Sequence, residues 1–95
     1  MKITKKVVFI AFENTIEELK ALLITMIEAS RNEKGCELYN IYQMKNKPDT
    51  FVVIETWENE EALKGHQNSD HYKHYKAHYE PFTKNKYSDE LEILG

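Results

Sequence analysis

Hydrophobic and polar residues follow one another along this chain with spacings that predict both strands and helices. Residues 3–12 are rich in β-branched and aromatic side chains, which is typical of a β-strand. Apolar residues then recur every three or four positions, as along one face of an α-helix: Ile16, Leu19, Leu22, Leu23, Met26 and Ile27. Thr15 and Glu18 have the spacing of a capping box, and Gly35 can adopt the left-handed conformation that ends helices. We therefore expect a helix that begins after Thr15 and stops at Gly35.

Two further strands and a hairpin turn are predicted next. Residues 36–44 and 51–58 carry aromatic and β-branched side chains, so each is expected to form a strand. The residues between them, 45–50, include Asn, Pro and Asp, which are typical of a turn. Residues 88–94 are predicted to form a last short strand.

Two helical segments separate the hairpin from the last strand. Asn59 and the two glutamates after it predict a short helix through about residue 68. Ser69 or Asp70 caps the next segment, which Pro81 ends or bends. The order strand–helix–strand–strand–helix–strand, with the second helical region split in two, predicts a ferredoxin-like plait of the α+β class. A length of 95 residues fits one such domain, spanning residues 1–95.

Both faces of two predicted strands are apolar. In residues 7–12 and 51–57 each of the two alternating sets is largely hydrophobic. An antiparallel sheet with one face in water should instead alternate apolar and polar residues. Since the helices can cover only one face, we predict an obligate homodimer in which a second copy covers the other, with Val52 and Ile54 in the interface.

The composition excludes several classes of protein and site. The chain has 13 basic and 16 acidic residues, and the basic ones are scattered, so we expect no nucleic-acid partner. Its three glycines form no dinucleotide or phosphate-binding loop. Cys36 is the single cysteine, which rules out an internal disulfide and predicts a small buried apolar side chain. Without a long apolar run we expect no membrane segment and a cytoplasmic location.

One face of a central strand provides candidate site residues. Phe51, Val53, Glu55 and Trp57 alternate along residues 51–57 and should point the same way, beneath the short helix that carries His66. An imidazole suits a general base because it titrates near neutral pH. Glu55 could orient His66, and the aromatic and apolar residues could form the wall of a pocket. The alternative is a His–Glu pair that only satisfies two partly buried groups around a core tryptophan.

Three histidines recur along the second helical segment. His71, His74 and His78 are spaced so that they could share one helix face, which would suit a metal ion. Lys73 and Lys76 lie among them, and no acidic or cysteine ligand joins them at helical spacing, so a solvated face is favoured. We predict no metal site.

Residues 54–66 (IETWENEEALKGH), 69–72 (SDHY) and 33–39 (EKGCELY) together resemble the antibiotic biosynthesis monooxygenase family, in particular its small quinol-monooxygenase-like members. The resemblance implies a dimeric α+β barrel with a pocket between sheet and helices in each subunit. It also implies oxygenation of phenolic or quinol substrates by O2 without metal, flavin or nicotinamide. In this family's pattern His71 lies at the pocket mouth.

Some residues of this chain differ from those that particular branches of the family use, and these differences disfavour the functions of those branches. Val53 stands where the polyketide-modifying members carry a polar asparagine. His66 stands at the tryptophan position of the haem-degrading members, and Lys76 lies near the position of their haem ligand. Residues 3–12 also lack the asparagine that those members use, so haem degradation is disfavoured.

The sequence thus predicts a cofactor-independent monooxygenase that acts on a small phenol or quinol. His66 and Glu55 are the expected catalytic residues. The expected substrate-binding residues are Phe51, Val53, Trp57, His71, Tyr72 and Tyr75. The two tyrosines could equally be core residues, since they recur at helical spacing. Two other functions remain open: an isomerase of a small carbonyl metabolite with the same base, and a non-catalytic dimeric domain that binds a small ligand.

Overall fold

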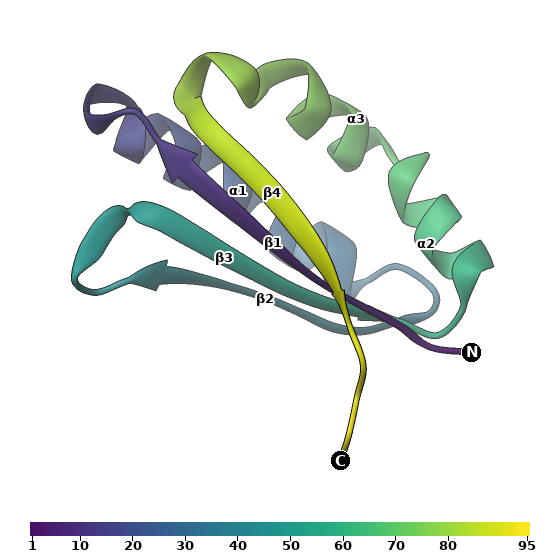
Figure 1. Cartoon of the computed structure of the whole chain (residues 1–95). Coiled ribbons are helices and arrows are strands. Elements are labelled where there is room, and N and C mark those ends of the chain that lie inside the picture. Colours follow the sequence, from purple (N-terminus) through teal and green to yellow (C-terminus); the bar gives the residue numbers. More distant parts are fainter.

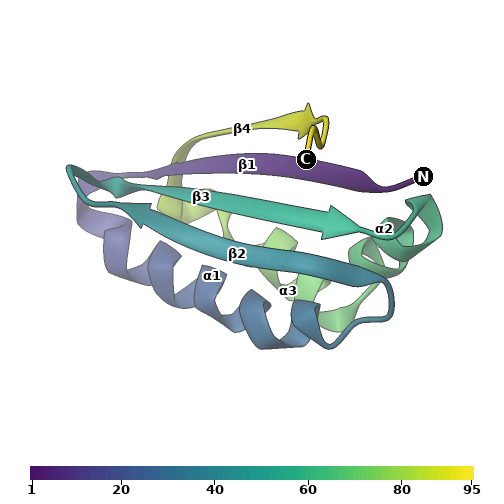
Figure 2. The same ribbon diagram turned by 90° about the horizontal axis from the view of Figure 1, so that it is seen from below.

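A computed structural model describes residues 1–95. Four antiparallel strands form one sheet in the order β2-β3-β1-β4, and the helices lie against one of its faces (Figure 1, Figure 2). The elements are β1 (Ile3–Ala11), η1 (Glu13–Thr15), α1 (Ile16–Arg31), β2 (Cys36–Met44), β3 (Lys47–Trp57), α2 (Glu60–Gln67), α3 (Asp70–His78), η2 (Glu80–Phe82) and β4 (Thr83–Leu91). The predicted ferredoxin-like plait, with its second helical region split into α2 and α3, is confirmed.

The core lies between the sheet and the helices. One alternating set of β1 and β3 side chains faces the apolar side of α1, because successive strand residues point to opposite faces. Tyr39 of β2 and Tyr75 of α3 complete this core. Its other members are Phe9, Ala11, Leu19, Leu22, Leu23, Met26, Phe51, Val53 and Trp57. None of the helices combines the length and apolar character needed to cross a bilayer.

The first helix differs from the prediction at both ends. Thr15 is its N-cap residue, but its side chain makes no capping bond; Oγ1 donates to the carbonyl of Phe82 at 2.9 Å. The predicted capping box is therefore wrong, because Thr15 ties α1 to η2 instead. The helix ends at Arg31, and Gly35 lies four residues later with a φ of 85°. The left-handed glycine is confirmed, but it serves the turn into β2 rather than the helix end.

Two strands also differ from their predicted bounds. β3 begins at Lys47, so the hairpin turn consists of residues 45 and 46 alone. β4 runs from Thr83 to Leu91 rather than over 88–94, because its ends follow the ends of β1, with which it pairs along its length. Pairing between strands, which local composition does not encode, sets both boundaries.

Gly35 brings the turn after α1 against the start of α2. Its carbonyl accepts a hydrogen bond from the amide of Glu58 at 2.8 Å. A Cβ at this glycine would stand only 2.5 Å from the Cβ of Ala62. The missing side chain therefore permits a close approach that places Glu33, two residues earlier, beside α2.

The opposite face of the sheet carries no helix (Figure 2). Val8 is enclosed there by its neighbours at 3% exposure, and Val52 and Ile54 are half-buried. The large apolar residues exposed along β2 and β4 are Leu38, Tyr42, Met44, Tyr87 and Leu91. The name "open face" is used below for the sheet face that bears Val8, Val52 and Ile54.

Candidate active site

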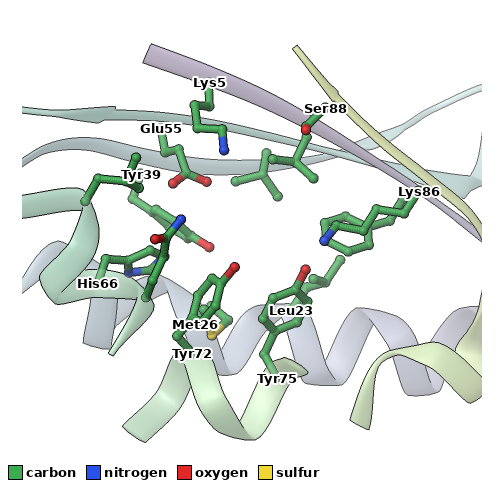
Figure 3. Close-up of a pocket in the computed structure, with 15 residues that line it drawn as sticks. Lys5, Leu23, Met26, Tyr39, Glu55, His66, Tyr72, Tyr75, Lys86 and Ser88 are labelled. Carbon is green, nitrogen blue, oxygen red and sulfur yellow. The ribbon is translucent and has the colours of Figure 1, made fainter. Parts of the chain in front are cut away.

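A cavity lies between the sheet and helices α1 and α3, with α2 at one end (Figure 3). It offers about 70 Å³ to the centres of water-sized molecules. Its wall is mixed: apolar side chains predominate, and hydroxyl, amino, carboxylate and imidazole groups enter from several elements. The lining residues are Lys5, Val7, Phe9, Leu23, Met26, Tyr39, Val53, Glu55, Leu63, His66, Gln67, Tyr72, Tyr75, Lys86 and Ser88. A mostly apolar hollow with a few polar groups is typical of a small-molecule site.

His66 is held at the α2 end of the cavity. Asn59 caps α2 by accepting the amide of Ala62 at 2.9 Å, and the helix turns His66 inward until only 2% of it is exposed. The imidazole lies over Trp57 with ring centroids 4.4 Å apart, and the edge of Tyr72 meets it at 5.0 Å. Trp57 and Tyr72 therefore both pack against the ring and restrict its orientation.

Glu33 joins two histidines through one oxygen. Its Oε2 lies 2.6 Å from Nδ1 of His66 and 2.7 Å from Nε2 of His71. Ser69 caps α3 by accepting the amide of Tyr72, and its hydroxyl donates to the carbonyl of His66 at 2.6 Å. The three side chains Glu33, His66 and His71, called the Glu33 cluster below, thus connect the turn before β2 with α2 and α3.

The Glu33 cluster determines which nitrogen of His66 is free. A carboxylate only accepts hydrogen bonds, so Nδ1 of His66 donates to it, and in the neutral imidazole Nε2 then carries the lone pair. Nε2 has no hydrogen-bond partner in the protein and is not fully enclosed, and His66 lines the cavity. The arrangement is that of a base oriented by a carboxylate, in a residue that lines a ligand-sized cavity.

Glu55 has a different partner from the one predicted. Its Oε1 accepts a hydrogen bond from the indole N–H of Trp57 at 2.7 Å, and it makes no hydrogen bond to His66. The predicted Glu55–His66 pairing is therefore wrong. Glu55 and Trp57 lie on the same face of β3 and bond to each other. Nδ1 of His66 points instead toward Glu33, in the turn before β2.

Three tyrosines bring hydroxyl groups to the cavity wall. Burial, and next to it the negative charge of Glu55, raises the pKa of Tyr39 and of Tyr72. Burial, followed by the neighbouring Tyr72, raises the pKa of Tyr75. The hydroxyls of Tyr72 and Tyr75 point into the cavity from α3 (Figure 3). All three phenols are therefore neutral at physiological pH and can donate hydrogen bonds to a ligand.

The predicted site residues separate into two groups. Those that line the cavity are Val53, Glu55, His66, Tyr72 and Tyr75. Phe51 lies in the core, Trp57 lies against His66, and His71 belongs to the Glu33 cluster; none of these three lines the cavity.

The three histidines of α3 do not form one set. His71 binds Glu33, while His74 and His78 are exposed and lie close to each other, with ring centroids 4.3 Å apart. Cys36 is half-buried at the edge of the core, and burial raises the pKa of its thiol.

Several site residues were missed from the sequence. Glu33 lies in the segment that carries the family resemblance, yet no local pattern indicates its partner. Lys5 shares the alternating set of Val7 and Phe9, so the period of β1 could have placed it on the inner face. Lys86 and Ser88 are inner-face residues of β4, whose start was predicted too late.

The Glu33 cluster is the one set of side chains in this structure with the composition of a metal site. Its ligand atoms lie within 4.8 Å of one another, and two imidazoles with a carboxylate suit Zn²⁺ or Fe²⁺. A metal ion binds nitrogen lone pairs, so the two ring nitrogens that now donate to Glu33 would first have to lose their protons. The absence of a metal stays a prediction.

Comparison with known proteins adds independent evidence. Residues 9–78 match the family model described as antibiotic biosynthesis monooxygenase. The Bacillus subtilis protein named "Putative monooxygenase YcnE" is 30% identical over 61 residues, which are 64% of this chain and 64% of that one. The Mycobacterium tuberculosis protein named "Putative monooxygenase Rv0793" is 37% identical over 59 residues, which are 62% of this chain and 57% of that one.

The matched stretches span between about a third and just under two thirds of the length of the curated relatives. Solved structures match over nearly the whole chain. PA3566 from Pseudomonas aeruginosa superposes with a TM-score of 0.94 at 29% identity, covering 99% of this chain and 95% of that one. Rv0793 superposes with a TM-score of 0.93 at 26% identity, covering 100% and 97%. This chain belongs to the antibiotic biosynthesis monooxygenase family.

Proposed function

We propose that this protein is a cofactor-independent monooxygenase that oxidises a small phenolic or quinol substrate with O2, using His66 as the base. The observation that carries the proposal is the 2.6 Å contact between Nδ1 of His66 and Glu33, which leaves Nε2 unpaired at the cavity. Family membership supports the oxygenation chemistry. A general base is what such chemistry needs from a protein, because the phenolate is the species that can give an electron to O2.

The size of the cavity supports a substrate with a single ring. The cavity has room for about five to seven water molecules, which occupy roughly 140–210 Å³ in the liquid, and a ligand of that volume would fill it. One substituted aromatic ring fits this volume, whereas a polycyclic polyketide does not. Val53, which replaces a polar residue of the polyketide-modifying members, adds apolar wall at the same site.

The reaction can be written with the substrate as the sole electron donor. Nε2 of His66 takes the hydroxyl proton, and the phenolate passes one electron to O2. The resulting pair of radicals joins to form a hydroperoxide at a ring carbon. Cleavage of the O–O bond leaves one oxygen atom on the ring and releases the other as water, so that a quinol becomes a hydroxyquinone. Displacement of water by the bound substrate keeps the charged species in strong contact with the wall.

Neutral hydroxyl groups support the charged stages of this reaction. Tyr72 and Tyr75 point into the cavity, and their raised pKa keeps them as donors. Such donors stabilise a phenolate or peroxide oxygen without first having to reorganise.

The Glu33 cluster also stabilises the protonated form of the base. Nδ1 of His66 lies 2.6 Å from Oε2 of Glu33, so a proton taken by Nε2 produces an imidazolium directly beside a carboxylate. Side-chain exposure is 2% at His66 and 16% at Glu33, so this pair of charges lies largely out of water. This arrangement supports His66 as a base that takes the substrate proton.

The proposal is tested by oxygen consumption with a panel of single-ring hydroquinones. His66→Ala should lower the rate by about 10²–10⁴-fold, as expected for loss of a general base. His74→Ala is the matched control, because His74 is exposed and does not line the cavity. Binding of quinols without oxygen uptake, or equal rates in both variants, would refute the proposal and favour a ligand-binding domain or an isomerase.

We also propose that the working unit is a homodimer joined through the open face. Val52 and Ile54 lie at its centre, and exposed apolar residues of β2 and β4 surround them. Exposed apolar side chains in this number on one face of a small protein mark an interaction surface, and the two-fold pairing of like surfaces is the commonest solution. Static light scattering at micromolar concentration should give the mass of two chains; a stable monomer would contradict the proposal.

A further inference from the structure

Two lysines on the sheet wall of the cavity form no ion pair. Lys5 extends from β1 and Lys86 from β4, and both line the cavity. Neither ammonium lies within 4.0 Å of a carboxylate, whereas Lys2 and Arg31 at the surface both do. A cation that is partly removed from water and has no counter-charge is costly unless a ligand supplies one.

Lys86 is the more confined of the two. Its ammonium stands 4.9 Å from the ring centroid of Tyr79 and 5.6 Å from those of Phe9 and Tyr75. Aromatic faces hold a cation in place but leave its charge uncompensated. Loss of hydration lowers the pKa of Lys86, and the positive charges of Lys76 and Lys5 lower it further.

The single acidic group on the wall does not balance these charges. Glu55 lies directly across the strand pair from Lys5, and one of its oxygens is committed to the indole N–H of Trp57. Two lysines against one carboxylate leave the wall with a net positive charge. Lys86 and His66 lie at opposite ends of the cavity, with the hydroxyls of Tyr72 and Tyr75 between them (Figure 3).

We propose that the cavity takes a single-ring aromatic acid, with its carboxylate at Lys86 and its hydroxyl at Nε2 of His66. The inference rests on the proposed function, which it deepens by naming the substrate class: hydroxybenzoates and dihydroxybenzoates, among which the isomer with para hydroxyls is a quinol. Lys86 is a substrate-binding residue that orients the ring, so that the hydroxyl meets the base. Ser88, on the same strand, adds a hydroxyl donor to this wall.

The test uses benzoate and benzamide, which have nearly the same shape and differ in charge. Calorimetric titration of the unmodified protein at low salt should give about tenfold tighter binding of benzoate. Lys86→Met keeps the apolar stem and removes the charge, so benzoate should fall to the affinity of benzamide. Lys84→Met is the matched control, because this exposed lysine of the same strand does not line the cavity. Lys86→Arg should restore most of the preference.

Variation of pH tests the same assignment without a mutation. Since the pKa of Lys86 is lowered, the ammonium loses its proton at a less alkaline pH than an ordinary lysine. Benzoate affinity should therefore fall as the pH rises through that range, while benzamide affinity stays constant. The charged and titratable groups that face this ammonium are Lys5, Glu55, Tyr75, Lys76 and Tyr79.

The outcomes separate this inference from the proposed function. Equal affinity of the unmodified protein for benzoate and benzamide would overturn the aromatic-acid site, whatever the rate of quinol oxidation. An unchanged preference in Lys86→Met would overturn the role of this lysine. A clear benzoate preference without oxygen consumption from any dihydroxybenzoate would support the acid site and refute the monooxygenase proposal.

Discussion

Replacing Glu33 by glutamine tests the Glu33 cluster most directly. The side chain keeps its shape but loses its charge and gains an N–H donor. The amide oxygen can still accept from Nδ1 of His66, but a neutral amide no longer stabilises the imidazolium that forms when Nε2 takes a proton. We therefore expect Glu33→Gln to lower kcat for quinol oxidation by at least about 10²-fold, close to the effect of removing the base.

The cost in stability can be worked out from the same contacts. Oε2 of Glu33 accepts from two imidazole N–H groups, at 2.6 and 2.7 Å. Hydrogen bonds to a charged group contribute about 1 kcal/mol more than neutral ones, so the variant should lose roughly 1–2 kcal/mol. For a domain of this size such a loss lowers Tm by about 4–16 °C. The fold should survive this loss, since the core does not contain Glu33.

The assay combines oxygen consumption, thermal unfolding and benzamide binding on one preparation. Benzamide affinity should stay within about twofold of the unmodified value, because Glu33 lies outside the cavity lining and a hydrogen bond that is not made to the ligand contributes little to its binding. Glu55→Gln is the matched control: its amide oxygen can still accept from Trp57, so we expect less than about a tenfold loss of rate. A larger rate loss in Glu55→Gln than in Glu33→Gln would refute the assignment of Glu33 as the positioning residue.

Three further predictions concern assembly, backbone and metal. Val52→Glu places a charge at the centre of the open face, where burying it should cost about 2–7 kcal/mol of dimer stability, so the variant should be monomeric or misfolded. Light scattering and circular dichroism distinguish these two outcomes, and an intact dimer would argue for another interface. Gly35→Ala combines a positive φ with a 2.5 Å approach to Ala62, so it should destabilise the fold by about 1–3 kcal/mol in urea unfolding and lower activity by displacing Glu33. Purified protein should contain no stoichiometric metal and keep its activity after chelation; a transition metal lost together with activity would instead make the Glu33 cluster a metal site.

Much of the fold could be predicted from short-range patterns. The helical repeat of α1 and the alternation along β1 and β3 indicate which side chains enter the core, because burial follows the period of each element. The caps of α2 and α3 are equally local, since Asn59 and Ser69 bond to amides three residues ahead. The bounds of β4 could not be predicted in this way, because pairing with β1 holds its polar residues 83–87 in the sheet.

The candidate site likewise has features that local sequence predicts and features that tertiary packing decides. The sequence by itself determined that His66 lies on a short helix near an inward-facing strand, because both facts follow from local periods. Only the tertiary structure decided the partner of His66. Glu33 is 33 positions away, and it arrives there because Gly35 lets the turn pack against α2. The two unpaired lysines of the cavity are likewise a property of packing, since the folded wall removes both ammonium groups partly from water and brings no carboxylate within 4.0 Å of either.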